Sequence, residues 1–340
     1  MRFAMIMAFA FVGATVLMGC GSSAGGEGGS AGVAEASAAE AGVKVPAFSA
    51  DSAYAHIVAQ TAFGPRVPGT EAHRRCAEYL TGTLERYGVE VKPWRKRITD
   101  FSGNSFELVN IVGRINPEAK RRILLAAHWD SRRWADEDAD PAKHSEPVTG
   151  ANDGASGVAV ILEMARVMSR ELPGVGIDIL LTDAEDSGKS APEGADDVEV
   201  MRYENSWCLG TQHWLKSDPY GEGERPEFGI LLDMVGAGGA VFPPEYYSLR
   251  LASHVVEKIL AAARRAGTSS RFPSPDGRVQ AINDDHVHLN GYGIPTADII
   301  DIRPGGFNPH WHTSQDTAEN IDLSTLGDVG RTVLNLIYNE

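Results

Sequence analysis

The chain has 340 residues, of which 43% are hydrophobic and 8% aromatic, so it is long and apolar enough to bury a sizeable core. Its 46 acidic residues outnumber its 31 basic residues, and the formal net charge is −15. Because binding to nucleic acid requires a basic surface, this charge argues against a nucleic acid as partner.

The first residues have the features of a secretory signal. Met1-Arg2 precedes the apolar run FAMIMAFAFVGATVLM, and the small residue Gly19 follows it. The run is short for a transmembrane helix. We therefore predict a signal peptide at residues 1–19 and an exported protein.

The sequence LMGC, residues 17–20, is similar to a bacterial lipobox. This similarity predicts that Cys20 carries a lipid and anchors the protein to a membrane, on the periplasmic or cell-surface side. The alternative is an ordinary signal peptide with an incidental cysteine. Residues 20–44 favour the lipoprotein, because a Gly/Ser/Ala-rich stretch is a flexible tether between an anchor and a folded domain.

Residues 45–340 have a uniform composition and no internal repeat, which predicts a single catalytic domain. Two further cysteines lie in it, Cys76 and Cys208, and their spacing leaves two alternatives open. They are either free, buried thiols or one disulfide, which export permits. Neither has the paired spacing of a cysteine zinc site.

Buried strands alternate with helices along this domain. In chain order, the patterns predict a helix at 70–88 with Gly88 as stop signal, strands at 89–98, 106–115 and 121–128, a helix at 157–172, strands at 176–183, 229–236 and 296–302, and a helix at 322–339 capped by Asp322 or Ser324. Such alternation predicts an α/β fold with a mostly parallel sheet that is covered on both faces.

Polar side chains follow the predicted strands at the ends where ligands bind in such sheets. They are His128 and Asp130, Asp153, the acidic run Asp183, Glu185 and Asp186, Asp233, the group Asp284, Asp285 and His286, and finally His312. So many carboxylates in one cleft repel one another, and a divalent cation removes that cost. Nitrogen and oxygen ligands without thiolate favour zinc.

The order of these motifs resembles the zinc aminopeptidase-like family. The residues that carry the resemblance are His-x-Asp, Asp-Gly-x-x-Gly, an acidic pair, Asp-Met-x-Gly and a late His-Thr, between Phe63 and the C-terminus. The resemblance implies a three-layer α/β/α sandwich around a mixed, mostly parallel sheet. It also implies one of two activities, because the family contains dinuclear zinc aminopeptidases and glutaminyl-peptide cyclotransferases with a single zinc ion.

Three segments are more similar to the cyclotransferases of the animal type. FGPRVPGTEAH, residues 63–73, looks like their opening segment. DDHVHL matches their Asp-Asp-His, where the aminopeptidases usually carry a serine, and FNPHWHT places aromatic residues ahead of His312. The resemblance therefore implies an enzyme that converts N-terminal glutamine of peptides or exported proteins to pyroglutamate and releases ammonia.

By motif position, the resemblance implies Asp153, Asp186 and His312 as ligands of one zinc ion. Glu185 is then the acid and base, with Asp233 and Asp284 as its hydrogen-bonded partners, and the substrate pocket is lined by Phe307, Trp311 and Trp207. Two features depart from the animal enzymes. Asp186 replaces a glutamate, and residues 187–206 form a long insert before Trp207, so Trp129 and Trp134 are alternatives for that pocket position.

Two rival functions stay open. A dinuclear zinc aminopeptidase is the first, because His128, Asp130 and Asp233 are all present. A surface binding protein on a retired enzyme fold is the second, although a binder has no need of the proton-transfer carboxylate of Glu185. The acidic residues 134–146, WADEDADPAKHSE, are predicted to form a solvated loop.

Overall fold

The computed structural model of the protein describes residues 43–275 and 279–340. The predicted signal peptide, Cys20 and all but the last two residues of the predicted tether therefore lie outside the described residues. Val43–Glu340 forms one compact unit. Within the described ranges, no helix has the length and apolarity needed to cross a membrane.

A six-stranded mixed sheet forms the centre of this unit, with strand order β1-β2-β4-β3-β5-β6. The strands are β1 (Glu90–Thr99), β2 (Ser105–Ile115), β3 (Arg122–His128), β4 (Gly176–Thr182), β5 (Phe228–Asp233) and β6 (Thr296–Ile300). The pairs β4–β3, β3–β5 and β5–β6 are parallel, while β1–β2 and β2–β4 are antiparallel. The carboxyl ends of β3, β4, β5 and β6 consequently lie at one edge.

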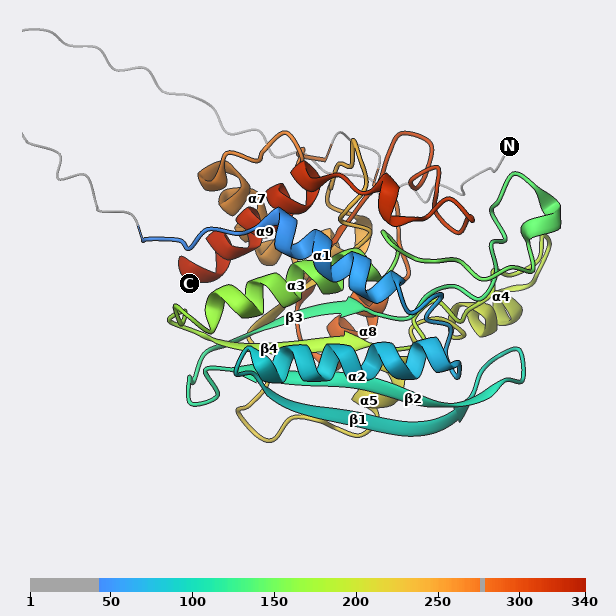
Figure 1. Cartoon of the computed structure of the whole chain (residues 1–340), viewed down its shortest axis with the longest axis horizontal. Helices are drawn as coiled ribbons and strands as arrows, with labels where there is room; N and C mark the ends of the chain where they lie inside the picture. Colours follow the sequence, from blue (N-terminus) through green and yellow to red (C-terminus); the bar gives the residue numbers. More distant parts are fainter. Residues whose placement is uncertain (1–42, 276–278) are drawn as a thin grey trace, which may run out of the picture. The chain divides into compact units, whose positions relative to one another are not determined.

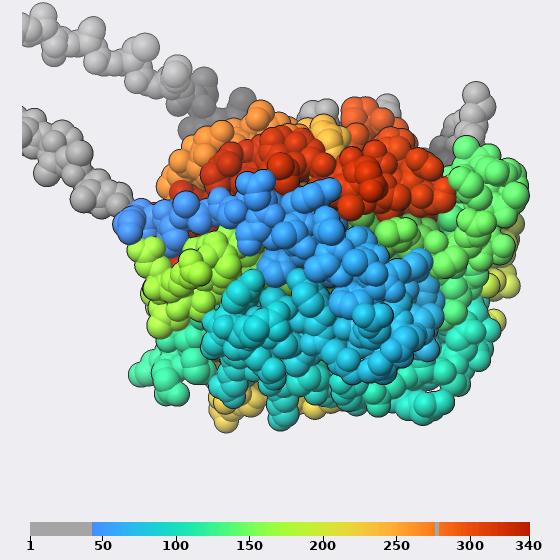
Figure 2. All heavy atoms as spheres, in the orientation of Figure 1, coloured from blue at the N-terminus to red at the C-terminus, as the bar shows by residue number. Residues whose placement is uncertain are grey.

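Helices cover both faces of the sheet (Figure 1), which confirms the predicted three-layer α/β/α class. One face carries α1 (Ala50–Thr61), α2 (Glu71–Arg86), α3 (Ala155–Met168), α7 (Ser253–Ala266) and α9 (Leu323–Tyr338). The other carries α5 (Leu209–Leu215) and α8 (Asp285–Tyr292). The remaining helices are α4 (Asp197–Glu204) and α6 (Tyr246–Leu251). α1 and α9 pack side by side, as the space-filling view shows (Figure 2).

The two helical layers explain why the central strands read as continuous apolar runs. In β3, Ile123 and Leu125 pack into the core under α3, whereas Leu124 and Ala126 pack against the α5 and α8 side. Every residue of β3 and β4 is buried. Their register is therefore strongly specified, and it fixes which polar residues emerge at the carboxyl edge.

The predicted strands and helices are confirmed within a few residues. α2 ends just before Gly88, whose φ of +78° is the left-handed conformation that favours glycine. Asp322, rather than Ser324, caps α9 by accepting the backbone N–H of Ser324. Cys76 and Cys208 are both free and buried, so the disulfide alternative is wrong.

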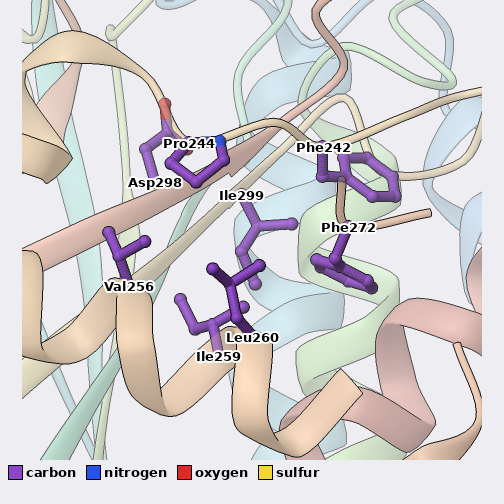
Figure 3. Close-up of a pocket in the computed structure, with 8 residues that line it drawn as sticks. All are labelled: Phe242, Pro244, Val256, Ile259, Leu260, Phe272, Asp298 and Ile299. Atoms are coloured by element: carbon purple, nitrogen blue, oxygen red, sulfur yellow. The ribbon is translucent and has the colours of Figure 1, made fainter. Parts of the chain in front are cut away.

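Two hollows lie away from the predicted site. A cavity of about 10 Å³ between α7 and β6 (Figure 3) has an almost entirely apolar lining. A groove of about 450 Å³ lies along α2, β1 and β2, and its lining includes the charged side chains of Glu71, Arg74, Glu78, Arg95, Arg97 and Glu107. No predicted site residue lines either hollow, so neither of them is the place where the predicted chemistry occurs.

Candidate active site

The fold brings the predicted polar residues together at the carboxyl edge of the sheet. His128 and Asp233 are the last residues of β3 and β5, and the pair Glu185–Asp186 follows β4. Two more carboxylates come from helix N-termini, since Asp153 lies just before α3 and Asp284 caps α8. His312 lies in the loop after β6.

The backbone is sharply bent around this site. In the described ranges, six non-glycine residues have a positive φ, and four of them flank or form the site: Ala184 (54°), Cys208 (55°), Met234 (50°) and His312 (54°). Left-handed backbone is costly for residues with a Cβ and persists where the surroundings enforce it. Such strain is concentrated at functional sites, and here it turns the strand ends toward a common centre.

Asp153, Asp186 and His312 form the first group of candidate ligands. The Nε2 atom of His312 lies 3.1 Å from Asp186 Oδ1 and 3.5 Å from Asp153 Oδ2, and all three residues are buried. Asp186 Oδ2 is buried without a hydrogen-bond partner in the described part of the chain. Two carboxylates and one imidazole, close together and partly unpaired, fit zinc. The donor set agrees with the predicted metal ligands.

His128, Asp153 and Asp233 form a second group that shares Asp153 with the first. His128 Nε2 lies 3.0 Å from Asp153 Oδ1 and hydrogen-bonds Asp233 Oδ1 at 3.2 Å. Burial by itself lowers the pKa of His128, but the surrounding carboxylates outweigh it and raise that pKa well above its usual value. Asp153 thus presents one oxygen to each histidine.

Asp130 holds the acidic pair in place. Its carboxylate accepts the backbone N–H groups of Glu185, at 3.1 Å, and Asp186, at 3.3 Å. Its Oδ1 also lies 3.5 Å from His128 Nδ1. The aspartate of the His-x-Asp motif therefore positions the acidic pair, next to the His128 of the same motif.

Two residues that sequence reasoning gave no role hold the Asp153 loop. Asp316 accepts the backbone N–H groups of Asn152, at 2.7 Å, and Asp153, at 3.0 Å. The fully buried Arg66, from the FGPRVPGTEAH segment, donates to the carbonyls of Thr149 and Gly150, both at 2.6 Å. In the sequence, the position of Asp316 four residues after His312 is the feature that could have pointed to its role.

Glu185 lies in a cluster of acidic groups. Its carboxylate lies close to that of Asp284 and to the Cys208 thiol, which donates a hydrogen bond to Glu185 Oε1 at 3.5 Å. Burial raises the pKa of Glu185 well above its usual range, and the nearby Asp284 carboxylate adds to the shift. Burial likewise raises the pKa of Asp284, with Asp233 and Asp285 contributing. Such a cluster holds protons that can be exchanged between neighbouring carboxyl groups.

The third acid of the 183–186 run points elsewhere. Asp183 pairs with His73 Nε2 at 2.8 Å and accepts the backbone N–H of Val109 at 2.7 Å. Trp129 is also turned into the core, where it is fully buried, stacks on His73 and donates its indole N–H to the Val109 carbonyl. Trp129 is therefore not a wall of this site.

The other predicted aromatic residues gather at His312. The rings of Trp311 and His312 stack at 3.7 Å between centroids, and Trp207 lies nearly parallel to His312 at 6.2 Å. Phe307 packs on Trp311 at 4.7 Å. The Trp134 ring contacts the Arg132 guanidinium, at 5.6 Å, and the Lys189 ammonium, at 4.9 Å. Trp207 is thus better placed than Trp134 for the pocket.

The prediction of a solvated loop at residues 134–146 is confirmed for most of the segment, which is exposed. The segment is also tied to the loop that carries His312. Glu137 donates its backbone N–H to the His312 carbonyl at 3.2 Å, and Asp138 accepts both the N–H and the hydroxyl of Ser314. These partners lie far away in sequence, so the pattern of residues 134–146 does not show them.

A mixed α/β/α sheet with buried carboxylates and imidazoles at its carboxyl edge defines a metal-dependent exopeptidase-like protein. Residues 110–337 match peptidase family M28, and the chain belongs to this family. Within it, the chain is similar to a glutaminyl cyclase of Bacteroides thetaiotaomicron, with 45% identity and a TM-score of 0.82 over 87% of this chain and 100% of the other.

Two further comparisons include one protein of each activity that the family contains. A leucine aminopeptidase precursor from Bacteroides thetaiotaomicron shares 45% identity and a TM-score of 0.80, over 88% of this chain and 99% of the other. Glutaminyl-peptide cyclotransferase of the snake Boiga irregularis is 26% identical over 284 residues, or 78% of this chain and 74% of its own. The resemblance inferred from the motifs is confirmed.

Proposed function

We propose that this protein is a glutaminyl-peptide cyclotransferase that uses one zinc ion bound by Asp153, Asp186 and His312. The observation that carries the proposal is the buried Glu185 carboxyl, which lies beside a ligand residue and is backed by Asp284. An acid of this kind can take a proton from a substrate amine and return it to a leaving group.

The reaction is an intramolecular acyl transfer. The α-amine of an N-terminal glutamine attacks its own side-chain amide carbon, a new C–N bond closes a five-membered ring, and the old C–N bond breaks to release ammonia. Zinc bound at the first ligand group would polarise the amide oxygen and stabilise negative charge there. Because nucleophile and electrophile belong to one residue, holding them in the reactive orientation contributes much of the rate.

Glu185 performs the proton transfer in this scheme. It accepts a proton from the attacking amine and delivers it to the departing ammonia, so its net protonation is unchanged over one cycle. In this scheme Asp284, whose carboxylate lies beside that of Glu185, shares a proton with it, and Asp233 acts on Asp284 in turn. Only a neutral amine can attack, so turnover should rise from acidic to mildly alkaline pH and follow the pKa of the substrate amine.

The aromatic residues at His312 supply the binding site for the substrate. Trp207, Trp311 and Phe307 present flat apolar surfaces next to the ligand group. The uncharged side chain of glutamine can pack against such rings without the cost of burying a charge. Substrates would be peptides or exported proteins that begin with glutamine.

The direct test offers purified, zinc-loaded protein a peptide that begins with glutamine and measures ammonia release together with loss of the free amine. The cyclase of Bacteroides thetaiotaomicron binds N-acetylhistamine, so this compound should compete with the peptide. If the loaded protein does not cyclise the peptide but hydrolyses leucine amide, the aminopeptidase function replaces the one proposed.

One observation favours that second candidate function. His128, Asp153 and Asp233 remain within ligand distance of one another, as a second metal would require. The contact between His128 Nε2 and Asp233, at 3.2 Å, does not count against a second metal, because His312 Nε2 lies as close to Asp186 Oδ1, at 3.1 Å, in the first group. Counting zinc in the purified protein separates the two functions: one ion per chain agrees with the cyclase and two agree with the peptidase.

We also propose that the enzyme acts outside the cytoplasm, where a lipid on Cys20 anchors it to a membrane. Support comes from the sequence of residues 1–44 alone: the apolar run, the LMGC motif and the Gly/Ser/Ala-rich stretch. In a bacterial host, the wild-type protein should incorporate labelled fatty acid and sediment with membranes. Cys20→Ala should lose the label and become soluble, whereas an unlabelled wild-type protein would contradict the anchor.

A further inference from the structure

Arg132 is a buried cation that the proposed reaction does not use. Its side chain is only 2% exposed. Its Nε and Nη2 donate to the two oxygens of Asp136 at 2.8 and 2.6 Å, and Nη1 donates to the carbonyls of Asp186 and Gly188, both at 3.0 Å. Burying a guanidinium is costly unless it is paired in this way.

The contacts of Arg132 converge on a predicted ligand. Besides the Asp186 carbonyl, Nη1 lies 3.3 Å from Asp186 Oδ1, the same oxygen that faces His312 Nε2 at 3.1 Å. The guanidinium therefore grips Asp186 at both its backbone and its carboxylate. Asp186 Oδ2 has no hydrogen-bond partner among the described residues, so it remains free to bind a cation.

The same guanidinium reaches the other sides of the site. It lies 4.7 Å from the centre of the Trp207 ring, on the face of the aromatic wall. Through Asp136 it also reaches the second ligand, because Asp136 Oδ1 lies 3.7 Å from His312 Nδ1. A carboxylate behind the ring nitrogen that does not face the metal is how proteins orient a ligand histidine.

We propose that Arg132 is a positioning residue that sets the orientation of Asp186 directly and that of His312 through Asp136, and that fixes the Trp207 wall of the pocket. The inference rests on the proposed ligands and pocket. A planar fork is needed, because one group must hold two oxygens of Asp136 while it contacts Asp186, Gly188 and Trp207. A lysine at this position has the charge but not the fork.

The test compares Arg132→Lys with Arg122→Lys in the full-length protein. Arg122 is a matched control: its side chain is 5% exposed, it bonds Asp178 at 2.6 and 2.8 Å, and it begins β3 while His128 ends that strand. Zinc affinity is measured by competition with a chelator, without turnover, and KM and kcat are measured on a glutamine-initiated peptide at saturating zinc.

Arg132→Lys should weaken zinc binding by about 10- to 100-fold, the usual effect of losing an outer partner of a metal ligand, and should raise KM. Arg122→Lys should leave zinc affinity and KM unchanged even if its melting temperature falls. Equal losses of zinc affinity in both variants would mean that Arg132 only stabilises the fold and does not position the ligands. Unchanged zinc affinity and KM in Arg132→Lys would overturn the proposal.

A second variant guards against misfolding of Arg132→Lys. Asp136 has a side chain that is 41% exposed, so Asp136→Asn should fold normally. It should weaken zinc binding while KM at saturating zinc stays close to the wild-type value, because Arg132 still contacts Trp207. Unchanged zinc affinity would contradict the proposal that Asp136 orients His312. If the wild type binds zinc but does not cyclise the peptide, the proposed function fails, and the affinity comparison still decides the role of Arg132.

Discussion

The two ligand groups that share Asp153 differ in what satisfies them. In the group with His128, the imidazole hydrogen-bonds Asp233, and Asp130 lies behind its other nitrogen. In the group with His312, one oxygen of Asp186 has no partner in the described part of the chain. His128 Nδ1 also has no hydrogen-bond partner among the described residues, so the two groups differ in kind: the first leaves an imidazole nitrogen that faces Asp130, and the second leaves a carboxylate oxygen free to bind a cation.

This difference supports the proposal that a scaffold with two adjacent ligand groups operates with one ion. A metal adds stability where it relieves unpaired, repelling oxygens. The surroundings agree, because Arg132 and Asp136 support the group with His312 from behind. The Glu185 carboxylate lies with Asp284 and Cys208, and the charges of His128 and Asp186 both act on it.

The largest effect is expected when the two neighbours Glu185 and Asp186 are changed separately. Glu185→Gln should keep one zinc ion and still bind a glutamine-initiated peptide, but turnover should fall by about 10²–10⁴-fold, the usual contribution of general acid–base catalysis. Asp186→Asn should lose activity because it loses zinc. Zinc content of the inactive proteins is the measurement.

The opposite pattern, with zinc lost from Glu185→Gln and kept by Asp186→Asn, would reverse the two roles. Full activity and normal zinc content in both variants would mean that this acidic pair is a structural turn and that the chemistry occurs elsewhere. Asp183→Asn is a matched control in the same run, since Asp183 faces His73 and Val109 rather than the site.

A smaller effect is expected from Asp233→Asn, which changes the group that contains His128. Zinc content should stay at one ion per chain, and turnover should fall by about 10- to 100-fold because Asp233 acts as a partner of the acid cluster. Metal analysis and kinetics on the same preparation check both parts. A wild type with two zinc ions and a variant with one would show that the second group binds metal after all.

A still smaller effect concerns the aromatic wall. Trp207→Ala should raise KM by up to about tenfold with little change in kcat, because an aromatic contact contributes about 0.5–1.5 kcal/mol beyond its buried area. Trp134→Ala should leave KM nearly unchanged, since that ring contacts Arg132 and Lys189 rather than His312. If KM rose in Trp134→Ala and not in Trp207→Ala, Trp134 rather than Trp207 would line the substrate pocket.

The fold was largely predictable because its central strands are apolar runs bounded by polar residues. Residues 122–128 and 176–182 are buried throughout, and no solvent-facing residue obscures the pattern. α7 escaped prediction although Val255, Val256, Ile259, Ala262 and Ala263 are buried at helical spacing, so its pattern was present in the sequence and was not used.

The candidate ligands were predictable from their motifs, but their supports were not. Asp316 holds Asn152 and Asp153 across more than 160 residues, and Arg132 reaches Asp186 across 54. No local pattern encodes such contacts, because they exist only once the strand ends are brought to one edge. The same holds for residues 134–146, whose acids look solvated until the His312 loop packs on them.

The smallest effect should appear in the two free thiols. Burial raises the pKa of Cys76 to about 12 and that of Cys208 well above its usual range, so at pH 8 neither carries the reactive thiolate. Cys208 hydrogen-bonds Glu185 beside the ligand group, whereas Cys76 lies on α2 in the core. Without zinc, repulsion among the carboxylates of the first group should loosen the neighbourhood of Cys208 alone.

Alkylation followed by peptide mapping measures this difference. In zinc-loaded protein both thiols should react very slowly, and after chelation Cys208 should react severalfold faster while Cys76 keeps its rate. Unfolding in denaturant should expose both and serves as the positive control. Since burial raises the folded pKa of Cys76 above its unfolded value, the stability from its protonated form is fully present below about pH 8.5 and is lost as pH rises toward 12. Equal acceleration of both thiols on chelation would mean that zinc stabilises the whole domain rather than the group around His312.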